Sequence, residues 1–259
     1  MTIFKALIAA ALVATAGTAK ADQLQDIINE GTITVGIALT GEPIGFRDDQ
    51  NNPVGYDVDV ANRLAEALGV ELEIVEVTGA NRIPMLESGQ IDLIIANITA
   101  TLERAKSIDF SIPYLRTGIK LLVGDGSDID SIDDLNGRSV VVGRGTTGEQ
   151  MVQRMAPDAE IVYVDVFAPD GLLLLRQGRA EAAIEDSSLV DYAANQYPEL
   201  ESVGDLLTSD PIAIGLRKGE PGLQRWLDMF VSQYISSGAY EENYVRWWGT
   251  EPVDLVAPW

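Results

Sequence analysis

The residues best suited to bind a charged small molecule follow an apolar segment in the first half of the chain. Residues 93–98 have the pattern of a buried strand, Asn97 lies near its end, and Thr99 and Arg104 follow. In open α/β sheets, ligands sit at the carboxyl ends of strands. Arginine holds a carboxylate through two parallel hydrogen bonds. The spacing therefore indicates a carboxylate-binding site, although residues 101–104 also fit the capped start of a solvated helix.

A glycine-rich turn forms a second candidate. Residues 139–143 have the pattern of a strand, and Arg144 and Thr147 follow within the sequence Gly-Arg-Gly-Thr-Thr-Gly, which opens a predicted helix. A helix N-terminus presents backbone N–H groups that have no intrahelical acceptor, and these groups bind anions. The segment lacks the spacing of a nucleotide P-loop or of a dinucleotide-binding turn. It therefore predicts either a general anion cradle or a plain strand-to-helix turn.

Two adjacent acids, Glu185 and Asp186, end a third predicted strand. A carboxylate there could meet an ammonium group in a cleft, or Asp186 or Ser187 could simply cap the following helix. Together, the three segments offer an arginine for a carboxylate, N–H donors for an anion and a carboxylate for a cation. A free α-amino acid carries both charges on one carbon, so the combination favours an amino-acid ligand.

The composition excludes several classes of function. The 259 residues contain 18 Lys and Arg, 40 Asp and Glu, and neither His nor Cys, for a net charge of −22. Disulfides, thiol nucleophiles, Ser-His-Asp triads and sites built from His or thiolate ligands are therefore absent. The negative charge argues against nucleic acid and anionic membrane surfaces as partners. We expect no metal site and no cofactor.

The first 21 residues have the pattern of a secretory signal peptide. Lys5 is followed by an apolar stretch at 6–19 and by Ala19-Lys20-Ala21, which matches a cleavage site. No later apolar run reaches the roughly 18–20 residues that a transmembrane helix needs. The sequence predicts a protein exported to the periplasm, in the Gram-negative manner, without direct membrane insertion.

Apolar segments rich in β-branched residues alternate with amphipathic segments along the whole chain, which predicts α/β layers with mainly parallel sheets. The alternation restarts after the Gly/Asp/Ser-rich residues 124–130, which indicates two lobes. Strands are expected at 32–38, 71–77, 93–98, 119–123, 139–143, 161–164, 180–184 and 212–216, and helices at 57–68, 80–87, 147–154, 171–177, 187–196 and 223–237.

Nine short segments, in order along the chain, resemble those of periplasmic amino-acid-binding proteins of ABC importers, the family 3 solute-binding proteins with the Venus-flytrap fold. The segments are 55–59 (GYDVD), 81–84 (NRIP), 89–92 (GQID), 99–104 (TATLER), 108–114 (IDFSIPY), 134–137 (DLNG), 145–147 (GTT), 178–182 (GRAEA) and 247–249 (WWG).

The resemblance implies a type II periplasmic-binding-protein fold, in which each lobe is a mainly parallel sheet flanked by helices and two crossover hinges join the lobes. Lobe 1 would comprise residues 22–116 and 212–259, and lobe 2 residues 117–211.

The resemblance also implies roles for individual residues. Arg104 would bind the ligand α-carboxylate, with Asn97 and Thr99 as hydroxyl and backbone partners. Thr147 would donate its amide from lobe 2, and Asp186 would bind the ammonium group.

Side-chain specificity stays open because the chain departs from the family's patterns. Ala38 stands where binders of basic or acidic amino acids often carry a charge, and Gly41 stands where an aromatic residue frequently stacks on the ligand. Arg82 matches a residue that contacts acidic side chains in glutamate/aspartate binders, although it also fits a surface helix beside Glu87. Arg82, and more faintly Arg144, favour an acidic or polar side chain.

The predicted function is capture of a free L-amino acid in the interlobe cleft and delivery to the membrane subunits of an ABC permease, by a monomer that is not an enzyme. One alternative is an exported enzyme of the same fold, such as a cyclohexadienyl dehydratase-like hydro-lyase, with Glu185 or Asp186 as general acid. A sensor domain of this fold is a further alternative, which the lack of a membrane-spanning segment in the sequence does not favour.

Overall fold

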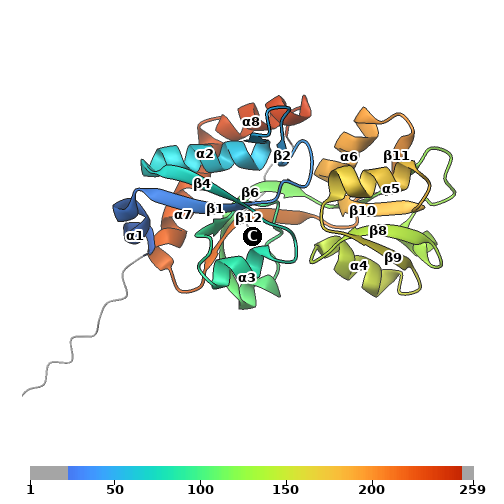
Figure 1. The fold of residues 1–259 in the computed structure, drawn as a ribbon, viewed down its shortest axis with the longest axis horizontal. Helices are drawn as coiled ribbons and strands as arrows, with labels where there is room; N and C mark the ends of the chain where they lie inside the picture. The colour runs from blue at the N-terminus through green and yellow to red at the C-terminus, as the bar shows by residue number, and fades with distance from the viewer. Residues whose placement is uncertain (1–22, 253–259) are drawn as a thin grey trace, which may run out of the picture.

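Two five-stranded sheets, each covered by helices, form the two lobes of the computed structural model, which describes residues 23–252 (Figure 1). The predicted signal peptide, residues 1–21, lies outside these residues. Sheet 1 contains, in spatial order, β4 (Glu71–Glu76), β1 (Thr32–Ile37), β5 (Leu93–Ile94), β12 (Asp210–Arg217) and β6 (Ile108–Thr117). Sheet 2 contains β11 (Leu200–Val203), β7 (Ile119–Gly124), β10 (Ala182–Asp186), β8 (Ser139–Gly143) and β9 (Glu160–Val164).

Each sheet is mixed, so the prediction of mainly parallel sheets is correct for only half of the strand pairs. In sheet 1, β1 pairs parallel with β4 and β5, while β12 pairs antiparallel with β5 and β6. In sheet 2, β8 pairs parallel with β9 and β10, while β7 pairs antiparallel with β10 and β11. The parallel strands belong to strand–helix–strand units, which need a crossover. The strands β6, β7 and β12 instead carry the chain between the lobes.

Helices cover both sides of each sheet. Around sheet 1 these are α1 (Gln23–Glu30), α2 (Tyr56–Leu68), α3 (Arg82–Glu87), α7 (Pro221–Ser236) and α8 (Ala239–Trp248), and around sheet 2 they are α4 (Thr147–Met155), α5 (Leu172–Arg176) and α6 (Ser187–Gln196). Figure 1 shows α2 and α8 on one side of sheet 1 and α3 on the other. The short pieces are β2 (Phe46–Arg47), β3 (Pro53–Val54), η1 (Arg104–Lys106), η2 (Ile132–Leu135) and η3 (Phe167–Gly171). No helix among residues 23–252 has the length and hydrophobicity needed to span a bilayer.

The apolar stripe predicted for residues 57–68 is present on α2. Val60, Ala61 and Leu64 are fully buried, and Gly69 ends the helix in the left-handed conformation with φ 72°. Glycine is favoured there because it has no Cβ to oppose a positive φ. The helix thus packs as the sequence pattern predicts.

The two connections between the sheets lie against each other. Gly118 joins β6 to β7, and a Cβ at this position would lie 2.2 Å from the carbonyl oxygen of Thr208 on the returning connection. The Ile119 N–H also donates to Thr208 Oγ1 at 2.8 Å. The crossovers therefore lie near the predicted lobe boundaries, whose residue limits stay a prediction.

Candidate functional site

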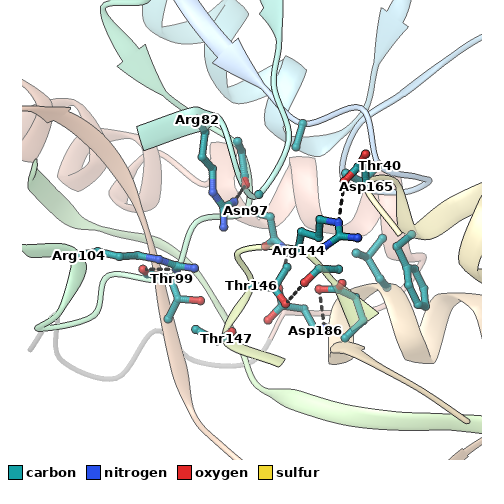
Figure 2. A pocket seen from close by; sticks show the side chains of 17 residues that line it. Thr40, Arg82, Asn97, Thr99, Arg104, Arg144, Thr146, Thr147, Asp165 and Asp186 are labelled. Carbon is teal, nitrogen blue, oxygen red and sulfur yellow. Dashed lines mark hydrogen bonds and ion pairs between the residues drawn. The ribbon is translucent and has the colours of Figure 1, made fainter. Parts of the chain in front are cut away.

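A pocket between the lobes brings together all seven residues that the sequence singled out as ligand-binding (Figure 2). The first lobe contributes Ala38, Thr40, Gly79, Arg82, Ala96, Asn97, Thr99 and Arg104, and the second contributes Gly143, Arg144, Thr146, Thr147, Asp165, Phe167, Glu185, Asp186 and Leu189. Arg104 and Asp186 thus share one cavity, as a zwitterion site requires. Their binding roles stay predictions.

Arg104 stands at the start of the short helix η1, where the Thr101 hydroxyl accepts a hydrogen bond from its backbone N–H at 3.2 Å. The predicted helix start is therefore present, but the side chain is 7% exposed rather than solvated. Its guanidinium donates to the Thr99 carbonyl at 2.8 Å and, across the cleft, to the Gly145 carbonyl at 3.0 Å. Both acceptors are neutral, so the guanidinium can still bind a carboxylate.

Asp186 is 5% exposed and lies at the pocket end of β10. It occupies the N-cap position of α6, but its side chain makes no capping hydrogen bond. Oδ2 instead accepts a hydrogen bond from Asn97 Nδ2 across the cleft at 2.7 Å, and Oδ1 is buried without a partner. Burial, and then the neighbouring Glu185, raise the pKa of Asp186. An ammonium group would satisfy the unpartnered oxygen and favour the ionised carboxylate.

Asn97 follows β5 in a left-handed conformation, with φ 44°. Its backbone N–H donates at 2.7 Å to Asp57 Oδ2, and the Tyr114 hydroxyl donates at 2.8 Å to Asp57 Oδ1. Asp57, fully buried in α2, thus fixes the loop that carries Asn97. Burial raises the pKa of Asp57 to about 7, although these two hydrogen bonds lower it.

The raised pKa of Asp57 predicts a pH dependence of stability. The folded chain holds this proton up to about pH 7, whereas the unfolded chain releases it near the ordinary aspartate pKa of 3.8. The folded state therefore binds more protons in between, and its stability falls as pH rises from about 4 to about 7. Asp57→Asn removes this titration, so its stability relative to the wild type should rise by up to about 4 kcal/mol over that range.

Urea unfolding of both proteins between pH 4 and pH 8 measures the difference. Asp128→Asn, at a side chain that is 75% exposed, is the matched control and should follow the wild type. Parallel pH profiles for Asp57→Asn and the wild type would contradict the prediction.

Arg82 begins α3 but lies inside the pocket rather than on the surface, because only 5% of it is exposed. Nη1 donates to the Ala96 carbonyl at 2.6 Å, and Nε is buried without a hydrogen-bond partner. Burial, and then the charge of Arg104, lower the pKa of Arg82 to about 9, so the guanidinium stays charged at neutral pH. The surface-helix interpretation of this residue is therefore wrong.

Arg144 and Thr147 come from the glycine-rich turn, as predicted. The Arg144 guanidinium lies 4.1 Å from the centre of the Tyr163 ring, and its Nε is 3.7 Å from Asp165 Oδ1. Thr147 is the first residue of α4, where backbone N–H groups have no intrahelical acceptor. The Gly145 N–H already donates to Glu149 at 2.7 Å. Part of the predicted anion cradle is therefore occupied by the chain itself.

The pocket also contains residues that the sequence did not assign to a ligand site. Phe167, which begins η3, lines it from the second lobe. The position that often carries an aromatic in the first lobe is Gly41, where a Cβ would lie 2.7 Å from the Cβ of Ala168. An aromatic wall is thus present, but it comes from the opposite lobe. Thr40 and Asp165 complete this side, and no sequence pattern marks any of these residues.

The two lobes are closed on each other. Besides the bonds of Arg104 and Asn97, the Ala168 N–H donates to the Thr40 carbonyl across the cleft at 2.7 Å. A Cβ at Gly145 would lie 2.6 Å from the Gly79 carbonyl oxygen. Within residues 23–252, no group of three or more acidic side chains is placed to hold a metal ion.

Comparison with known proteins gives consistent matches over most of the chain. The profile of the bacterial extracellular solute-binding proteins, family 3, matches residues 33–250. The ABC transporter glutamine-binding protein GlnH of Bacillus subtilis is 31% identical over 240 residues, covering 91% of this chain and 88% of that protein. The glutamate/aspartate import solute-binding protein of Salmonella typhimurium is 30% identical over 237 residues, covering 86% and 78%. A mutant of ArgBP from T. maritima superposes with a TM-score of 0.83 at 34% identity, covering 88% of this chain and 99% of that one.

Proposed function

Because this chain belongs to the bacterial extracellular solute-binding proteins of family 3, we propose that it captures a free L-amino acid with an acidic or polar side chain and delivers it to an ABC permease. The proposal is carried by one observation. The buried guanidinium of Arg104 and the unpartnered carboxylate oxygen of Asp186 come from different lobes and line the same pocket. An α-carboxylate and an α-ammonium group would satisfy the two together.

Binding would couple to closure because the ligand contacts are divided between the lobes. Arg104, Asn97 and Thr99 of the first lobe would hold the ligand in the open state. Thr147 and Asp186 of the second lobe would reach it only when the lobes close. These additional contacts give the closed state its higher affinity, so the ligand shifts the population toward closure.

The family and the sequence support a proposal for the cellular setting. Its members are extracellular binding proteins, and the relatives named above serve ABC transport or amino-acid import. We place this chain in the periplasm of a Gram-negative cell after removal of residues 1–21. There it would act as a monomer whose closed form contacts the permease subunits.

A panel of the common L-amino acids in a thermal unfolding assay tests the function. A ligand that binds only the folded state at 100 times its dissociation constant stabilises it by about 2.7 kcal/mol, so a cognate amino acid should raise the melting temperature clearly. Calorimetry should then give one ligand per chain. No response to any amino acid would contradict the proposal.

The same samples distinguish a binding protein from an enzyme of this fold. Glu185 and Asp186 are buried, and burial raises the pKa of both carboxyls, which is the property a general acid needs. A binding protein returns its ligand chemically unchanged. Chromatography that detects a converted product would favour the hydro-lyase alternative instead.

A further inference from the structure

The pocket contains more charged side chains than the α-carboxylate and α-ammonium groups of an amino acid can pair with. One positive and one negative side chain remain without an assigned partner. Under the proposed function, Arg104 takes the α-carboxylate and Asp186 takes the ammonium group. Arg144 has Asp165 beside it, 3.7 Å away. The remaining charged residues of the pocket are Arg82 and Glu185, one from each lobe.

Arg82 and Glu185 are both buried, at 5% and 7% exposure. Burial raises the pKa of Glu185 against the opposing effect of the Arg82 charge, and burial lowers the pKa of Arg82 against the opposing effect of the Glu185 charge. Yet within residues 23–252 they form no ion pair, since no nitrogen–oxygen approach of 4.0 Å or less joins them. Each can therefore meet a ligand group in the pocket that both side chains line.

Each of the two retains hydrogen-bonding capacity. Arg82 points into the pocket in Figure 2, and its Nε is a buried donor without an acceptor. Glu185 Oε1 accepts from the Asp186 N–H at 3.1 Å. Its Oε2 lies 3.3 Å from where a Cβ of Gly143 would be, so it faces the glycine-rich turn. The subsite offers a cationic donor on one side and an anionic acceptor on the other.

These surroundings discriminate among ligand side chains by charge. A carboxylate would pair with Arg82 but would face the Glu185 carboxylate, and an ammonium or guanidinium group would pair with Glu185 but face Arg82. Like charges in contact are strongly unfavourable in a desolvated site. A carboxamide avoids both conflicts, because its oxygen accepts from Arg82 while its NH₂ group donates to Glu185.

We propose that Arg82 and Glu185 form a side-chain subsite selective for a carboxamide, so that the ligand is L-glutamine or L-asparagine. This inference rests on the proposed function and narrows its ligand class. Glu185 is then a specificity-determining residue rather than an acid catalyst.

Calorimetry with L-glutamine, L-glutamate, L-asparagine and L-aspartate at one neutral pH tests the proposal. Within each isosteric pair, the wild type should bind the amide at least about tenfold more tightly than the acid. Glu185→Gln removes the negative charge at nearly constant shape. It should reduce that ratio by about tenfold or more, chiefly through tighter binding of the acid.

Glu201→Gln, on the edge strand β11, is the matched control and should leave the ratio unchanged. A merely structural effect of Glu185→Gln would weaken amide and acid equally, and this result would overturn the proposal. Tightest binding of an acidic or basic amino acid by the wild type would also overturn it while leaving the proposed function intact. If no amino acid binds, the proposed function fails, and this inference fails with it.

Discussion

Arg104→Ala is expected to abolish measurable amino-acid binding. The side chain is 7% exposed, so a carboxylate bound beside it would be desolvated and would depend on this guanidinium for its charge partner. Removing one member of a buried ion pair costs about 3 to 5 kcal/mol, which weakens affinity roughly 100- to 4000-fold. The variant also loses the hydrogen bond to the Gly145 carbonyl, which joins the lobes in the closed state. Both effects act in the same direction.

Isothermal titration calorimetry with the cognate amino acid measures the loss. Arg104→Lys should fall between the wild type and the alanine variant, because an ammonium group retains the charge but not the planar fork that binds both carboxylate oxygens. Arg47→Ala is the matched control, since this arginine is exposed and pairs with Glu76 at 3.0 Å. Near-native affinity in a folded Arg104→Ala protein would refute the assigned role.

The strand ends that carry the site could be predicted because local patterns mark them. The buried run at 93–98 contains β5, although only Leu93 and Ile94 pair as a strand. Ile95, Ala96 and Ile98 remain fully buried, so the apolar pattern was correct about burial. The chain leaves the sheet early because Asn97 takes a positive φ, held by Asp57 from a helix 40 residues earlier. No local pattern contains that contact.

The orientation of the two lobes relative to each other could not be predicted from local sequence patterns. The ends of β8 and β10 lie together because these strands pair in parallel, and this neighbourhood follows from the predicted α/β architecture. The ends of β8 and β10 also lie close to the end of β5 in the other lobe. This proximity depends on the two segments that connect the lobes and on contacts such as the hydrogen bond from Asn97 to Asp186. Family resemblance supplied the arrangement that periodicity alone could not.

Local sequence patterns also could not locate individual side chains in the pocket, as Arg82 and Phe167 show. A charged residue at the first position of a helix is normally solvated, so the local pattern left the position of Arg82 open, and only the family resemblance placed it near a ligand before the fold showed it in the cleft. Phe167 reaches the pocket through the irregular segment η3, for which hydrophobic periodicity has no pattern. Residue spacing alone therefore could not identify every side chain that lines the pocket.

Asp186→Asn should weaken the binding of every amino-acid ligand roughly 100-fold, because its partner is the ammonium group that all of them share. The neutral amide keeps one oxygen that can accept the hydrogen bond from Asn97 Nδ2, now 2.7 Å from Asp186. It cannot neutralise an ammonium group, and its NH₂ group offers the ammonium only further donors. Calorimetry across several amino acids should show a common loss. A loss confined to one side-chain class would place Asp186 in the side-chain subsite instead.

The same substitution should have the opposite effect on the unliganded protein. Asp186 and Glu185 are adjacent buried carboxyls, and burial together with the charge of Glu185 raises the pKa of Asp186, so its ionised form is unfavourable without a ligand. The Asp186→Asn side chain cannot ionise, so the melting temperature without ligand should stay equal or rise while the ligand-induced increase becomes much smaller. Asp128→Asn, at the exposed partner of Arg138, should change neither value. A variant that lost stability and binding in parallel would instead show that Asp186 acts mainly in folding. A variant that is at least as stable as the wild type but binds ligand more weakly would show that the buried carboxylate serves ligand binding rather than stability.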